Sequence, residues 1–203
     1  EAGTETQGNK AFRKVLTVHD LIPFLAPDAV SRTLRAYMHL QMPRALEAAD
    51  RIICVSLWTA QCLEILYPAA KNKISVIMNG KPELLSHRPA PAEKTTIFTL
   101  SRGESYKRLQ LIPAIFKALS GRYEWHVLTD GKGLDTLKGV AGLHLHTSLS
   151  DAALDDLWQK TEIFVHPSLW EGYCLPAATA LSRGIPAIFT GGSGIDEVVG
   201  GAG

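Results

Sequence analysis

Short apolar, β-branched runs alternate along the chain with longer stretches whose apolar residues recur at helical spacing. The runs predict strands at residues 14–18, 51–55, 73–78, 96–100, 124–129, 143–146, 162–166 and 186–190. The longer stretches predict helices at residues 29–48, 57–67, 107–120, 150–160 and 176–183. Pro43 should kink or split the first of these helices. Regular alternation of this kind predicts an α/β fold with parallel sheets covered by helices on both faces.

One segment interrupts the alternation. Residues 81–94, KPELLSHRPAPAEK, contain three prolines and no periodicity, which is typical of an interdomain linker. Residues 95–203 then hold five predicted strands, nearly a complete doubly wound domain, whereas residues 1–80 hold three. We therefore expect a fragment of a longer protein, with a truncated first domain and a second domain that lacks its last elements.

The bulk composition narrows the class of protein. Apolar residues make up 46% and charged residues 20%, and the formal net charge is +1 without a long like-charge run. This argues against a nucleic-acid-binding protein. Three cysteines (Cys54, Cys62 and Cys174) form no CxxC pair, which favours a reducing compartment and predicts a cytoplasmic protein. No run approaches the ~18 apolar residues of a membrane span.

Two cations follow the predicted strand at 96–100. In LSRGESYKRL, Arg102 and Lys107 lie where a strand turns into a helix that should begin near Lys107. Ligands of open α/β sheets bind at the carboxyl ends of strands, so these residues could hold a diphosphate. The alternative is a solvated basic loop. A second strand end, TDGKG at 129–133, has Gly131 and Gly133 but neither a full GxGxxG nor a P-loop, so a plain turn is the preferred interpretation.

The segment HPSLWEGYCLPAATALSRG, residues 166–184, places Glu171 between a strand and a helix that opens with Pro176 and ends before Gly184. A helix N-terminus suits a phosphate, and a carboxylate beside it could accept hydrogen bonds from sugar hydroxyls. Glu171 could equally do no more than complement the helix dipole.

His19, at the end of the first predicted strand, could donate to a sugar hydroxyl or could be structural. The remaining histidines show no HExxH or other ligand spacing. His144 and His146 share a strand face, but two ligands are too few for a metal site. The chain has no GxSxG elbow and no cysteine in a nucleophile context, so covalent hydrolase chemistry is unsupported.

Together these segments resemble the family-4 glycosyltransferases, which are retaining, metal-independent enzymes of the GT-B fold with two Rossmann-like domains. The resemblance covers nearly the whole chain. The segments that carry it, in the family's order, are TVHDLIP, ADRIICVS, KISVIMNG, LSRGESYKR, HPSLWEGYCLPAATALSRGIPAI and GSGIDEVVG. The block at 166–184 is the most specific of them.

The resemblance implies roles for individual residues. Arg102 and Lys107 would contact the diphosphate of the donor, and Glu171 would match the first glutamate of the family's Glu-x7-Glu motif, beside the transferred sugar. His19 would approach that sugar from the first domain. Glu197 matches a family glutamate to which no firm role is assigned. The family's Gly-Phe-Gly-Leu-Pro turn, whose amides face donor sugar and phosphate, corresponds here to Gly172, Tyr173, Cys174 and Leu175.

The chain departs from the family pattern at two positions. Thr179 stands where the second glutamate of the motif, which usually binds the ribose, is expected. A threonine hydroxyl is a weaker, uncharged substitute, so donor affinity or nucleotide choice should change. Cys174 replaces a glycine and restricts a backbone position where a missing Cβ would allow close ligand approach.

The resemblance implies transfer of a hexose such as mannose or glucose from a nucleotide-diphosphate sugar to a glycan or lipid-linked acceptor, with retention and with neither cofactor nor metal. Peripheral association with the inner face of the membrane through missing parts stays open. Two other functions remain: a non-catalytic or impaired nucleotide-sugar-binding domain, which Thr179 motivates, and a GT-B nucleotide-sugar epimerase.

Overall fold

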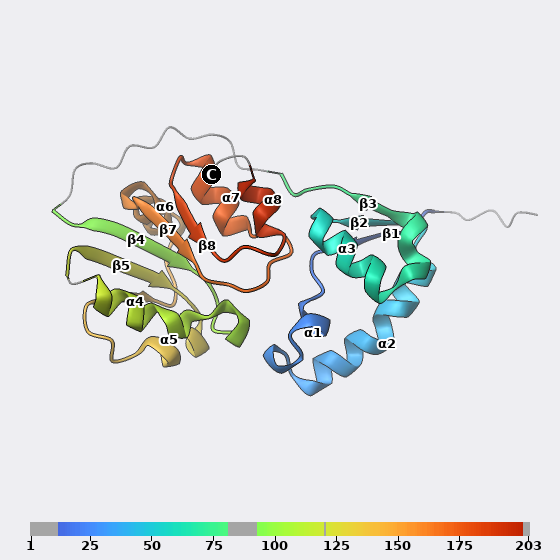
Figure 1. The fold of residues 1–203 in the computed structure, drawn as a ribbon, viewed down its shortest axis with the longest axis horizontal. Helices are drawn as coiled ribbons and strands as arrows, with labels where there is room; N and C mark the ends of the chain where they lie inside the picture. Colours follow the sequence, from blue (N-terminus) through green and yellow to red (C-terminus); the bar gives the residue numbers. More distant parts are fainter. Residues whose placement is uncertain (1–11, 81–92, 120, 201–203) are drawn as a thin grey trace, which may run out of the picture.

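A computed structural model describes residues 12–80, 93–119 and 121–200 of the chain. All strands in this part of the chain pair in parallel and form two sheets, one in each of two lobes (Figure 1). We call residues 12–80 the first lobe and residues 93–200 the second lobe. The predicted α/β fold with parallel sheets is thus confirmed. Most of the predicted linker, residues 81–92, lies outside the described residues.

The first lobe has a three-stranded sheet in the order β1-β2-β3. Its strands are β1 (Val15–Val18), β2 (Arg51–Cys54) and β3 (Ile74–Val76), and its helices are α1 (Ile22–Leu25), α2 (Arg32–Ala48) and α3 (Leu57–Leu66). Short 3-10 turns span Pro27–Ala29 and Pro68–Lys73. The helix α2 continues through Pro43 without a break. Leu21, Ile52 and Leu63, which are fully buried, form the centre of the core between sheet and helices.

The second lobe has a five-stranded sheet in the order β6-β5-β4-β7-β8. Its strands are β4 (Thr95–Leu100), β5 (Tyr123–Leu128), β6 (Leu143–His146), β7 (Ile163–His166) and β8 (Ala187–Phe189). Its helices are α4 (Ile112–Ala118), α5 (Gly131–Leu137), α6 (Asp151–Lys160), α7 (Leu175–Ser182) and α8 (Ile195–Val199). None of the three helices α1, α5 and α8 was among those expected from the sequence.

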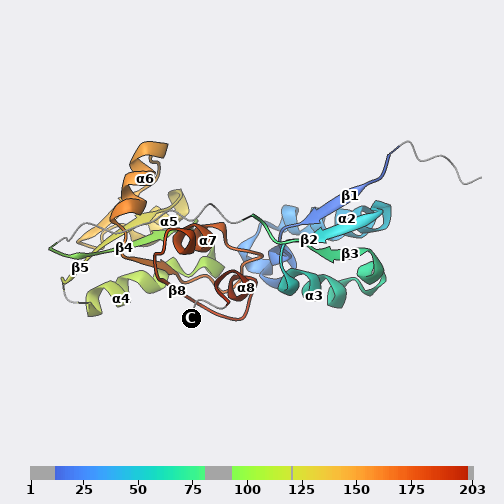
Figure 2. The same ribbon diagram turned by 90° about the horizontal axis from the view of Figure 1, so that it is seen from above.

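Successive residues of β4 point to opposite faces of the sheet, so each face has its own core. Ile97 packs with Trp125 and residues of α4 and α5 on one face, and Phe98 packs with residues of α6 and α7 on the other. Helices therefore cover both faces, as in a doubly wound domain. The lobes lie side by side, with α8 next to the first lobe in both views (Figures 1 and 2).

The predicted helix at 107–120 is only partly correct. Two 3-10 turns, Ser105–Lys107 and Leu109–Leu111, precede α4, which begins at Ile112. Between the turns Arg108 has a left-handed backbone with φ of 57°. A non-glycine residue in this region interrupts a right-handed helix, so the chain changes direction directly after Lys107.

Candidate active site

The strand order of the second lobe places a topological switch point between β4 and β7. In sequence order these neighbours are the lobe's first and fourth strands, and the chain leaves their carboxyl ends in opposite directions. Open α/β sheets bind ligands at such a switch point. Ser101 follows β4 and His166 ends β7, so both segments singled out in the sequence, LSRGESYKRL and HPSLWEGY, meet here.

A buried charged cluster lies at this switch point. The Nζ atom of Lys107 and the Nε2 atom of His166 each lie 2.6 Å from Oε1 of Glu171. The exposed fractions of the three side chains are 13%, 2% and 10% for Lys107, His166 and Glu171. Hydrogen bonds to an ionised group in such surroundings are short and strong. The structure therefore brings together two of the predicted site residues, Lys107 and Glu171, in direct contact.

The cluster keeps Glu171 ionised. Burial alone would raise the pKa of its carboxyl, but the hydrogen bond from His166 and the charge of Lys107 outweigh burial and lower that pKa to about 2. Both partners use Oε1, and the other oxygen, Oε2, has no hydrogen-bond partner among the described residues. A carboxylate held this way can accept a further hydrogen bond from a ligand hydroxyl.

Sequence reasoning missed His166. Because a carboxylate oxygen can only accept, the proton of the contact lies on Nε2 of His166. Its other nitrogen, Nδ1, is buried and has no partner in the described parts of the chain. The available signal was its position as the last residue of a buried strand, five residues before Glu171, because strand-end side chains of an α/β sheet line the crevice.

The turn at 105–107 positions Lys107. Tyr106 is buried against Ile22 and Ala26 of the first lobe, with Trp170 packed beside them. The Lys107 ammonium lies 5.0 Å from the centre of the Tyr106 ring, within cation–π range. Contacts from both lobes thus fix the segment that carries this lysine.

Arg102 lies apart from the buried cluster. Its side chain is 71% exposed, and its Nε atom lies 3.7 Å from Oε2 of Glu104. It borders a cavity of about 390 Å³ at the carboxyl ends of β4, β5 and β6. The hydroxyls of Ser101 and Thr129, which also line this cavity, are buried without a partner among the described residues. The cavity therefore presents polar groups with unused hydrogen-bonding capacity.

The TDGKG segment is more than a plain turn, because α5 starts within it. Oδ1 of Asp130 accepts from the amide of Gly133, which caps the helix, and from the amide of Gly103. A Cβ on Gly103 would lie 2.1 Å from the Gly133 nitrogen, so only glycine allows this approach. The glycines thus pack two strand-end loops together, with Asp130 between them.

The turn at 172–175 lies at the lobe boundary. Tyr173 is buried with Val55 of the first lobe, and its hydroxyl has no partner in the part of the chain described. Cys174 has φ of 74°, the left-handed region, which explains the glycine of the family pattern at this position. Leu175 begins α7 and is 56% exposed. The Thr179 hydroxyl donates to the carbonyl of Leu175 at 3.0 Å, within its own helix.

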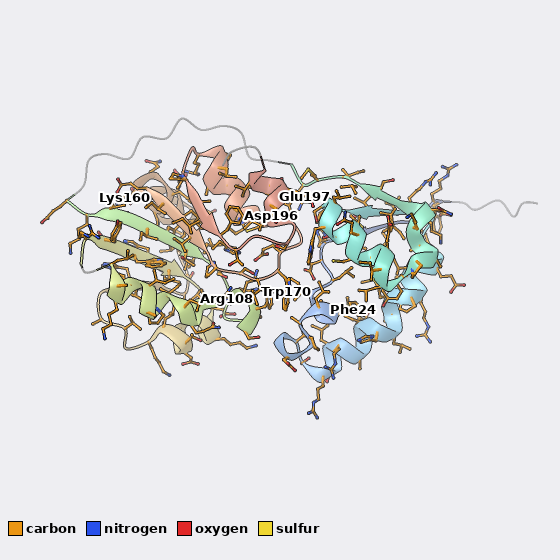
Figure 3. All side chains as sticks on the ribbon, in the orientation of Figure 1. Phe24, Arg108, Lys160, Trp170, Asp196 and Glu197 are labelled. Atoms are coloured by element: carbon orange, nitrogen blue, oxygen red, sulfur yellow. The ribbon has the colours of Figure 1, made fainter. Side chains whose placement is uncertain are left out.

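Two further predicted residues lie where the lobes meet. His19 is exposed, and a Cβ on Gly172 would lie 1.8 Å from its carbonyl oxygen. The carboxylate of Glu197 accepts from the amides of Leu57 and Trp58, both at 2.7 Å, at the first turn of α3. Glu197 lies on the side of the second lobe that faces the first (Figure 3). This residue, which had no firm role, therefore caps a helix of the other lobe.

The family models that match the chain cover both lobes. Residues 81–202 match the model described as "Glycosyl transferases group 1", and residues 7–81 match "Glycosyltransferase Family 4". An O-antigen chain mannosyltransferase B of Escherichia coli is 24% identical over 94% of this chain and 56% of its own length. The Salmonella typhimurium O-antigen chain mannosyltransferase RfbU is 24% identical over 86% of this chain and 51% of its own.

Solved structures share the fold. A sucrose-phosphate synthase of Thermosynechococcus elongatus superposes with a TM-score of 0.73 at 15% identity, over 92% of this chain and 52% of that one. Anabaena HepE, solved in complex with UDP and glucose, gives 0.68 at 17% identity, over 91% and 55%. The fold is therefore of the GT-B type. The chain spans about half the length of the curated relatives it matches.

Proposed function

Because the chain belongs to the glycosyl transferases group 1 family, we propose that it takes part in transfer of a hexose from a nucleotide-diphosphate sugar to an acceptor hydroxyl, with retention of anomeric configuration. The buried cluster of Lys107, His166 and Glu171 at the switch point is the observation that carries this proposal. The mannosyltransferase relatives favour mannose, and their O-antigen substrates favour a glycan or lipid-linked acceptor. No helix among the described residues is long and apolar enough to cross a bilayer.

In this proposal Glu171 orients the donor sugar. A carboxylate whose pKa is about 2 is a weak base at neutral pH, so it is poorly suited to remove the acceptor proton. Its contacts with Lys107 and His166 also reduce its strength as a nucleophile. Its second oxygen is available to accept from a sugar hydroxyl, and His19 contacts the same sugar from the first lobe.

The diphosphate would lie between Lys107 and Arg102. As the sugar–phosphate bond breaks, negative charge develops on the leaving phosphate, which fixed cations stabilise. The acceptor oxygen bonds to the anomeric carbon on the same face, and its proton passes to the leaving diphosphate. These reaction steps require no metal and no covalent intermediate on the protein. The cavity beside Arg102, with the Ser101 and Thr129 hydroxyls, takes the nucleoside portion.

Calorimetric titration of the chain with UDP, GDP and ADP tests the diphosphate site. We expect binding of at least one of these nucleotides, and a loss of ten-fold or more in affinity for Arg102→Ala/Lys107→Ala, because two charge-assisted contacts are removed. The matched control is Lys138→Ala/Lys160→Ala, which removes two exposed cations that form surface ion pairs at the C-terminal ends of α5 and α6. Equal affinity of the two double variants would overturn the assignment.

Retention is tested by the product. The full-length protein should convert an α-linked nucleotide sugar into an α-linked product, as read from the one-bond coupling between C1 and H1 in an NMR spectrum of the first turnover products. A β-linked product would contradict the proposed same-face attack of the acceptor oxygen on the anomeric carbon, but it would not contradict the diphosphate site.

Thr179 favours a second candidate function, a nucleotide-sugar-binding domain with weak or no catalysis. Its hydroxyl is neutral and already donates to the Leu175 carbonyl, so it replaces poorly a carboxylate that would bind the ribose. Thr179→Glu in the full-length protein separates the two functions. A large gain in transfer rate would indicate an enzyme with a weakened donor site, and unchanged inactivity together with tighter donor binding would favour the binding role.

A further inference from the structure

A cluster of three histidines and a glutamate covers one face of β5 and β6. Glu124 and His126 lie on β5, and His144 and His146 lie on β6. His126 and His144 are direct partners in the parallel ladder, so the pleat brings all four side chains to one face. Trp125, between the two β5 residues, points to the opposite face and is fully buried.

The cluster lies away from the proposed sugar site. Glu124 and His144 border a cavity of about 790 Å³ whose lining includes Lys94 and Gly142, the residues directly before β4 and β6. This is the amino end of the strands, whereas Lys107 and Glu171 lie beyond the carboxyl ends. The proposed transfer reaction therefore makes no use of Glu124 and His144, whereas His146 ends β6 next to Thr147 of the cavity beside Arg102.

The distances within the cluster match a metal site. The Nε2 atoms of His126 and His144 lie 2.9 Å and 3.4 Å from Oε1 of Glu124. One ligand atom from each of these residues lies within 4.8 Å of the other two. In a tetrahedral zinc site with bonds of ~2.0 Å, ligand atoms lie about 3.3 Å apart. We propose that Glu124, His126 and His144 bind a divalent transition-metal ion of the zinc type on this face of the sheet.

His146 completes the arrangement as a positioning residue. Its Nε2 atom lies 3.0 Å from Nδ1 of His126. When a metal takes the Nε2 lone pair of His126, the ring proton must lie on Nδ1, and His146 is placed to accept it. Metal-binding histidines commonly donate their second ring nitrogen to such an acceptor, which fixes both tautomer and ring orientation.

One side chain must move for the ion to bind. The rings of His126 and His144 are stacked, with centroids 4.6 Å apart and planes at 15°, so their lone pairs lie in separate, nearly parallel planes and do not converge on one ion. His144 is 50% exposed and free to turn toward the ion, whereas His126 is only 17% exposed and is held by Glu124 and His146. We therefore expect His126 to be the fixed ligand and His144 the one that closes on the metal.

The ligand types select the class of metal. Two imidazoles and one carboxylate suit zinc and its neighbours, with water in the fourth position, whereas magnesium and calcium prefer oxygen ligands throughout. An ion bound by residues of β5 and β6 would also tie the edge strand β6 to the sheet. The site would thus stabilise the second lobe without entering the transfer reaction.

Calorimetric titration of the 203-residue chain with Zn²⁺ alone tests the proposal, using protein without a histidine tag and stripped of metal with a chelator. We expect one Zn²⁺ per chain, a loss of at least ten-fold in affinity for His144→Asn and Glu124→Gln, and a loss of about 10- to 100-fold for His146→Asn. His39→Asn, which removes an exposed imidazole on α2, should bind as wild type. Mg²⁺ should not compete with Zn²⁺.

The substitutions at 124 and 144 decide the outcome, because both side chains are partly exposed and their loss should leave the fold intact, as far-UV circular dichroism can verify. Replacing the nearly buried His126 is a supporting experiment. Absence of a one-to-one Zn²⁺ complex in wild type, equal affinities of wild type and His144→Asn, or equal binding of Mg²⁺ would each overturn the proposed site. None of these results depends on sugar transfer, so the proposed function stands or falls separately.

Discussion

At the scale of single residues, the chemistry of the proposed site depends on Glu171. The places of Glu171 and Lys107 beside strand ends left their roles open, the family resemblance predicts them as donor-site residues, and that role stays a prediction. Their direct contact could not be predicted, because 64 residues separate them in the chain. The left-handed backbone conformation of Arg108 could not be predicted either. Contacts with residues distant in the sequence, which place Lys107, override the helical pattern of the local sequence.

The lowered pKa of Glu171 predicts how stability depends on pH. The folded-state pKa of about 2 lies below the ordinary value of 4.5, so the stabilising contribution is complete above pH ~5 and is lost as pH falls toward 2. Between pH 5 and pH 3 this carboxylate should account for about 2 kcal/mol of the fall in the free energy of unfolding. Glu171→Gln should therefore show a flatter profile than wild type in urea titrations across this range.

Lys107→Met provides the matched comparison, since it removes one of the two partners that stabilise the carboxylate and leaves Glu171 in place. Its profile should fall between those of wild type and Glu171→Gln. Superimposable profiles of wild type and Glu171→Gln would show that the carboxylate is not held in its ionised form by this cluster.

At the scale of elements, strand positions were the most predictable feature. Each predicted strand overlaps an observed one. Short β-branched runs bounded by turn residues favour the extended conformation over a helix. The short helices α1 and α8 were missed because four or five residues carry too little periodicity. The histidine cluster was missed because sequence shows that His144 and His146 share a face but does not give the register that brings His126 beside them.

The helix α3 offers a test of contact between elements. Ser56 accepts from Thr59, and Glu197 of the other lobe accepts from Leu57 and Trp58, so the first amides of this helix are all bonded. Glu197→Ala would leave two of them without a protein partner. We expect the free energy of unfolding to fall by roughly 1–2 kcal/mol, as for loss of a charged N-terminal cap.

Urea titration followed by tryptophan fluorescence measures this change. The control is Glu64→Ala, which removes from α3 a carboxylate paired with Lys71 of the following 3-10 turn and should change stability by less than about 0.5 kcal/mol. Equal effects of the two substitutions would show that Glu197 contributes no more than an ordinary surface charge.

At the scale of the whole molecule, the lobes are joined by contacts that the sequence could not reveal, because their partners lie more than 100 residues apart. The close approach of Gly172 to the backbone of His19 is one of these contacts. A Cβ at this position would lie 1.8 Å from the His19 carbonyl oxygen, so no side chain fits while the lobes stay together. Gly172→Ala should lower the free energy of unfolding by about 1–3 kcal/mol or separate the lobes and increase the radius of gyration.

Separation would also be expected to weaken nucleotide binding, because Gly172 adjoins Glu171 and its displacement would shift the carboxylate away from Lys107. Small-angle X-ray scattering and calorimetry on the same samples would register both effects. Gly131→Ala is the matched control, since a Cβ there meets nothing within 4 Å, and it should behave as wild type in scattering and stability. If Gly172→Ala matched Gly131→Ala in all these measurements, the lobes would not be held in solution by the contact between Gly172 and His19. This contact holds the backbone of His19 beside Gly172, the neighbour of Glu171, so the proposed contact of His19 with the donor sugar depends on the same result.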